Sequence, residues 1–124
     1  MNAKDYFMLY RLMLTEISKY APNTDVAIVY HLGDNKNFRK LYSKYGKYKI
    51  DNILREMILD MDNNGIIKLT VAKPLIINSV TLLGYTILDE LKEPSLFDKI
   101  KKNLVEITKS SLSEVLVKII TDSF

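Results

Sequence analysis

Basic and amide side chains gather in one stretch of this chain, between residues 36 and 55. Residues 36–50 contain six basic residues and no acidic residue. Arginine can hydrogen-bond guanine, and asparagine can hydrogen-bond adenine, through two bonds in each case. Lysine, arginine and tyrosine can also bind phosphate oxygens. The candidate residues for nucleic-acid recognition are therefore Lys36, Arg39, Lys40, Lys44, Lys47, Tyr48, Lys49, Asn52 and Arg55.

The positive charge of the chain is local. All 124 residues together carry 18 basic and 15 acidic side chains, a net charge of +3. Without the six basic residues of 36–50, 12 basic residues stand against 15 acidic ones, so the remainder has a net charge of −3. Such a segment favours a polyanionic partner, but it is also typical of a solvated face on a protein-interaction module.

A helix over residues 48–63 is expected to position Asn52 and Arg55. On a helical wheel of about 100° per residue, one face is apolar and the opposite stripe holds Tyr48, Asn52, Arg55, Leu59 and Asn63. One feature argues against phosphate binding, because residues 51–64 contain four acids and only Arg55 as a base. These acids fall at the edges of the outward face. The residues on the apolar face are Ile50, Ile53, Leu54, Met57, Ile58 and Met61.

Helices and one hairpin are expected around this segment. Apolar spacing predicts helices over 4–20 and 35–45, another after Thr81 to about Leu91, one from Pro94, and a last one opened by a capping box at Ser111–Glu114. Residues 25–32 are ambiguous between strand and helix, and the helix is favoured. The runs 66–72 and 75–80 predict two strands joined by a turn at Ala72-Lys73-Pro74. Gly46 and Gly65 are expected to end helices.

This order of helices and hairpin resembles the winged helix–turn–helix superfamily. The resemblance covers about residues 35–105. Small uncharacterised YjcQ-like and phage-associated winged-helix proteins of Gram-positive bacteria look similar, including an aromatic and lysine-rich stretch like residues 96–102. The residues that carry the resemblance are Leu54, Met57, Ile58, Met61, Gly65-Ile66-Ile67 and Val80-Thr81-Leu82-Leu83-Gly84-Tyr85.

The resemblance implies an α+β fold that is mostly helical. It implies a winged-helix domain over residues 1–92 with a hairpin wing at about 66–80. A C-terminal helical pair at 93–124 would pack on this domain or form a homodimer interface. In a helix–turn–helix the second helix enters the major groove of double-stranded DNA. A transcriptional regulator of phage or mobile-element type is therefore expected. Lys73 at the wing tip would contact DNA or only aid solubility. The alternative is an adaptor module of the same fold that binds protein and not DNA.

Several classes of function lack support in the sequence. The chain has no cysteine and a single histidine, His31, so we expect no catalytic site, metal site or cofactor and no enzyme activity. Residues 60–65 superficially resemble a calcium loop, but Val71 stands where the terminal glutamate would be. No apolar run reaches the roughly 18–20 residues that span a membrane, and no signal-peptide layout is present. A cytoplasmic protein is therefore expected.

Overall fold

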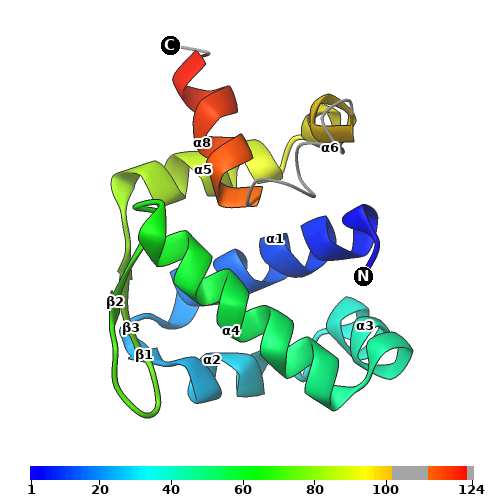
Figure 1. The fold of residues 1–124 in the computed structure, drawn as a ribbon, viewed down its shortest axis with the longest axis vertical. Helices are drawn as coiled ribbons and strands as arrows, with labels where there is room; N and C mark the ends of the chain where they lie inside the picture. The colour runs from blue at the N-terminus through cyan, green and yellow to red at the C-terminus, as the bar shows by residue number, and fades with distance from the viewer. Residues whose placement is uncertain (102–111, 123–124) are drawn as a thin grey trace.

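Helix α1 (Ala3–Tyr20) lies at the centre of the computed structural model, which describes residues 1–101 and 112–122 (Figure 1). It contacts α2, α3 and α5 and the strand β3, so it links the two ends of the molecule. Asn2 caps it by accepting a hydrogen bond from the Asp5 N–H at 2.8 Å. Met8 and Leu12, which fall on its polar side, are half-buried and pack against the core. The fully inward residues are Phe7, Leu9, Tyr10, Met13, Leu14 and Ile17.

The three strands form one antiparallel sheet in the order β1-β3-β2. The predicted hairpin is confirmed, with β2 at Ile67–Thr70 and β3 at Ile76–Val80. The strand β1 (Asn23–Thr24) was not predicted, because two residues show no periodicity. It pairs with Ile76 and Ile77 of β3. The sheet and the helices together make a mostly helical α+β fold.

Helices α2 (Asp25–Leu32), α3 (Lys36–Tyr45) and α4 (Lys47–Asn63) follow β1 in the chain. The ambiguous segment 25–32 is a helix, and the Thr24 hydroxyl caps it by accepting from the Ala27 N–H at 3.2 Å. Gly46 and Gly65 have φ angles of 87° and 73°, which favour glycine at these helix boundaries. Figure 1 shows α4 running from its start beside α3 to its end near the sheet, where it contacts β2.

The C-terminal helices α5 (Leu82–Leu91), α6 (Pro94–Lys101) and α8 (Leu112–Asp122) cover the other side of α1. The Phe7 and Phe97 rings meet edge to face at 5.4 Å, and α8 contacts α5. The buried residues of α8 are Leu112, Ser113, Val115, Leu116 and Ile120. These helices therefore pack on the rest of the chain. Ser111 of the expected capping box lies outside the described residues. No helix in the described ranges is long and apolar enough to cross a membrane.

Candidate nucleic-acid interface

Helix α3 and the first half of α4 form the basic end of the molecule. Asn35 caps α3 by accepting from the Asn37 and Phe38 N–H groups at 2.9 and 3.1 Å. The inward side chains Phe38 and Leu41 then fix which face of α3 is exposed. Between residues 36 and 55 the chain has seven basic residues and one acid, a net charge of +6. All seven basic side chains are exposed: Lys36, Arg39, Lys40, Lys44, Lys47, Lys49 and Arg55.

The predicted outward stripe of α4 is present over its first half. Tyr48 is 83% exposed, and Asn52 and Arg55 are also exposed. Leu59 departs from the expectation, because it is half-buried and packs against the core. The helix contacts β2. The stripe that can meet a partner therefore ends at Arg55, although Asn63 is exposed again at the helix end.

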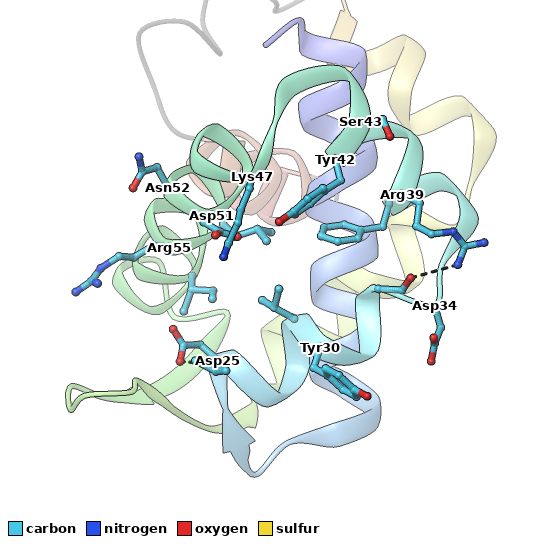
Figure 2. A pocket seen from close by; sticks show the side chains of 16 residues that line it. Asp25, Tyr30, Asp34, Arg39, Tyr42, Ser43, Lys47, Asp51, Asn52 and Arg55 are labelled. Carbon is cyan, nitrogen blue, oxygen red and sulfur yellow. Dashed lines mark hydrogen bonds between the residues drawn. The ribbon is translucent and has the colours of Figure 1, made fainter.

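The ten predicted residues do not all share one surface. Arg39, Lys47, Asn52 and Arg55 line a cleft between α2, α3 and α4, shown in Figure 2. Lys36, Arg39, Lys40 and Lys44 line a second hollow along α3. Lys44 and Lys49 each hold their ammonium group 5.3 Å from the centre of the Tyr45 ring. Lys73 is exposed in the connection between β2 and β3 and lines neither hollow.

The cleft between α2, α3 and α4 has a volume of about 990 Å³ and was not predicted. Its lining contains three acids, Asp25, Asp34 and Asp51, as well as three bases, Arg39, Lys47 and Arg55, so its formal charge is zero. Two apolar residues of α2 at this cleft are well exposed, Val26 at 65% and Tyr30 at 80%. A signal for it existed in the sequence, since an eight-residue helix with almost no polar face must bury all its sides or leave one for a partner.

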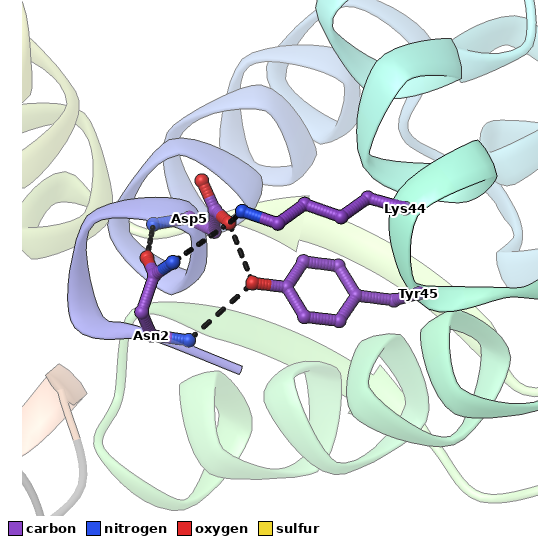
Figure 3. A network of polar contacts seen from close by, with 4 residues as sticks. All are labelled: Asn2, Asp5, Lys44 and Tyr45. Atoms are coloured by element: carbon purple, nitrogen blue, oxygen red, sulfur yellow. Dashed lines mark hydrogen bonds and ion pairs between the residues drawn. The ribbon is translucent and has the colours of Figure 1, made fainter.

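One basic residue, Lys44, is already occupied by an ion pair inside the chain (Figure 3). Its ammonium group lies 2.8 Å from Asp5 Oδ2, and the Tyr45 hydroxyl donates to the same oxygen at 2.5 Å. The hydrogen bonds from Lys44 and then from Tyr45 lower the pKa of Asp5, and the bond to Asp5 raises the pKa of Lys44. Asn2 also donates to Asp5 at 3.1 Å. This network joins the start of α1 to the end of α3, and no local pattern could predict it, because Asp5 and Lys44 are 39 positions apart in the chain.

Two of the four acids of α4 that argued against phosphate binding, Asp60 and Asp62, lie toward the end of the helix that contacts β2. Asp62 accepts a hydrogen bond from the Leu69 N–H at 3.1 Å, at the junction with β2. Asp60 is half-buried and accepts from the Asn64 amide at 3.2 Å. Burial, with the charges of Asp60 and Glu56, raises the pKa of Tyr6 to about 12. Asp60 and Asp62 are therefore engaged within the molecule, whereas Asp51 and Glu56 are exposed, and Glu56 follows Arg55 directly in the chain.

His31 lies in the last turn of α2 and stacks on the Tyr20 ring, with centroids 3.8 Å apart. Within residues 1–101 and 112–122, no group of three or more histidine, cysteine or acidic side chains could hold a metal ion.

Comparisons with known proteins gave no match, whether against protein-family models, curated proteins or solved structures. The winged-helix resemblance therefore stays an expectation from the sequence, based on the order of the elements and on the residues named above.

Proposed function

We propose that this chain is a small DNA-binding protein of the winged-helix type that acts as a transcriptional regulator. The observation that carries the proposal is the exposed end of α3 and α4, with a net charge of +6 over residues 36–55 beside the exposed Asn52 and Arg55. Phosphate attraction supplies most of the affinity of such surfaces, whereas base contacts supply specificity.

The order of elements supports the winged-helix assignment. A group of helices comes first, α4 is the last of them, and the hairpin β2–β3 follows α4 after a short turn at Gly65. In this assignment α4 takes the place of the helix that enters the major groove. The hairpin is then the wing, with Lys73 in its exposed connection.

Different residues would have different tasks on DNA. Asn52 and Arg55 lie about one turn apart on the outward stripe of α4, and both can reach base edges with two hydrogen bonds. Lys36, Lys40 and Lys47 are exposed and suit phosphate contacts, and the Tyr48 hydroxyl can donate to a phosphate. Lys44 contributes less, because its ammonium group is already paired with Asp5.

Fluorescence anisotropy with labelled duplex DNA, measured over a range of salt concentrations, tests the proposal. With four to six phosphates neutralised, log affinity should fall with log salt at a slope of about −4 to −5. Arg55→Ala should weaken preferred sequences most, whereas Lys40→Ala should weaken all sequences alike. Lys118→Ala, an exposed lysine on α8, is the matched control and should change neither.

Folded protein that binds no duplex DNA at low salt would overturn this proposal. The second candidate function, a protein-interaction module, would then be the better one. The exposed Val26 and Tyr30 beside the cleft favour it, because large apolar side chains grouped at a surface are typical of protein contacts.

A further inference from the structure

The surface around α2 has protruding apolar side chains and, beside them, a cleft that is partly lined by apolar residues. Val26 and Tyr30 are four positions apart, so they lie on one face of the helix, and both are largely exposed. Beside them, the cleft between α2, α3 and α4 has an apolar floor. The residues of that floor are Val29, Phe38, Leu54 and Ile58.

Five of the six charged residues of this cleft are separated by element, and the exception is Asp51, which lies on α4 between Lys47 and Arg55. Asp25 and Asp34 lie at or just beyond the two ends of α2, whereas Arg39, Lys47 and Arg55 come from α3 and α4 (Figure 2). Within the part of the chain that the structure describes, none of these five forms an ion pair within 4.0 Å. Arg39 donates to the Gly33 carbonyl at 3.2 Å and Asp25 accepts from the Val26 N–H at 2.8 Å, but neither charge is neutralised, so each side can still attract an opposite charge on a partner.

A two-fold symmetric interface places the same patch on both partners. A patch with a net charge repels its own copy, but a neutral patch with acids on one side and bases on the other attracts it. The cleft has three acids and three bases, and it has apolar side chains to insert as well as a floor to receive them.

We propose that this cleft binds a second copy of the chain. Helix α2 of each copy packs in the cleft of the other, with Val26 and Tyr30 against the apolar floor. The acids at the ends of α2 then face Arg39 and Arg55 of the other copy. This surface differs from the terminal helices expected from the sequence, whose apolar faces pack within the chain.

The proposed dimer would also cover two residues assigned to DNA. Asn52 and Arg55 line the same cleft, so a second copy seated there blocks their access to bases. This consequence rests on the proposed function, and it makes self-association and specific DNA binding compete. The dimer itself does not depend on DNA binding and is tested without it.

Sedimentation velocity over a wide range of protein concentrations is the first test. The wild-type chain should shift from monomer to dimer as its concentration rises. Tyr30→Ser should weaken dimer formation about tenfold or more, as is typical of a central aromatic residue. Tyr48→Ser is the matched control, because Tyr48 is equally exposed at 83% but lies outside the cleft lining. Both residues are exposed, so both variants keep the fold.

A charge exchange is the sharper test. Asp34→Lys with Asp51→Lys gives the lining five bases and one acid, and Arg39→Glu with Arg55→Glu gives it five acids and one base. Each double variant alone should remain a monomer because its patches repel each other. A mixture of the two should form a one-to-one dimer, and added salt should weaken that dimer.

Three results would overturn the proposal. The first is a wild-type chain that stays monomeric at every concentration. The second is a dimer that Tyr48→Ser, or Leu82→Ser on the exposed face of α5, weakens as much as Tyr30→Ser does. The third is a mixture of the two charge variants that fails to associate while each keeps its helical circular dichroism. Loss of DNA binding alone would contradict the proposed function and leave the dimer standing.

Discussion

The hydroxyl groups of Tyr10 and Ser113 hydrogen-bond to each other at 2.7 Å in the interior, although the two residues are 103 positions apart in the chain. Both residues are fully buried. The contact joins α1 to α8 and explains how a serine is accommodated in an otherwise apolar face. Burial raises the pKa of Tyr10, so this tyrosine stays protonated and able to donate over the ordinary pH range.

Tyr10→Phe should lower the free energy of unfolding by about 1–3 kcal/mol, because it leaves the buried Ser113 hydroxyl without its partner. Chemical denaturation monitored by circular dichroism measures the change. In the double variant Tyr10→Phe/Ser113→Ala both hydroxyls are gone, so its loss should be smaller than the sum of the two single losses. Strict additivity would show that the two hydroxyls do not interact in solution.

The ion pair of Asp5 with Lys44 should make stability depend on pH. The pKa of Asp5 is lowered by folding, so its contribution is present above the ordinary value of 3.8 and is lost as pH falls through the lowered pKa. The pKa of Lys44 is raised by folding from its ordinary value of 10.5. The stability that Lys44 contributes is therefore present at pH values below 10.5 and is lost at higher pH. Asp5→Asn should therefore destabilise the protein near neutral pH and have little effect in strong acid.

Denaturant midpoints of the wild type and of Asp5→Asn, compared across the acid range, measure this dependence. Lys118→Ala serves as a control for general charge effects, because it removes an exposed lysine from α8. Parallel curves for the wild type and Asp5→Asn at every pH would contradict a structural role of this pair.

Gly84→Ala should destabilise the protein by about 1–3 kcal/mol, as overpacking of an interior does. A Cβ atom at this position would lie 2.2 Å from the Ile66 carbonyl oxygen, which also accepts the hydrogen bond from the Thr81 N–H at 3.0 Å. Inside an ordinary helix, replacing glycine by alanine instead stabilises the protein by roughly 0.5–1 kcal/mol. Thermal unfolding measures the effect of Gly84→Ala. Leu82→Ala, at an exposed site of the same helix, should be nearly neutral, and a neutral or stabilising Gly84→Ala would show that α5 does not approach Ile66 this closely.

Lys40→Ala and Lys44→Ala should differ in their effect on DNA binding. Lys40 is exposed and has no ion pair within the described residues. Its loss should therefore make the slope of log DNA affinity against log salt concentration less steep by about one. Lys44→Ala should change the slope less, because this lysine is paired with Asp5. Anisotropy titrations at several salt concentrations compare the two. A larger effect of Lys44 than of Lys40 would mean that DNA displaces Asp5 from its partner.

The sequence by itself determined most of the local structure. Apolar residues at helical spacing predicted α1 and α4 to within a residue or two, and the β-branched runs on either side of Pro74 predicted the hairpin. The exposure of Asn52 and Arg55 followed from the same spacing, because the residue positions on a helix fix which side faces the core. Thr24 and Thr81 cap helices through hydrogen bonds to groups three residues away, which is local chemistry.

Only the tertiary structure decided which distant residues meet. The strand β1 exists because β3 offers its edge to Asn23 and Thr24, and two residues have no pattern of their own. The pairing of Asp5 with Lys44, the contact of Tyr10 with Ser113, and the cleft beside Val26 and Tyr30 all join elements far apart in the chain. Side-chain periodicity reports which way a residue faces on its own element, but the neighbours across the interior depend on how the elements pack together.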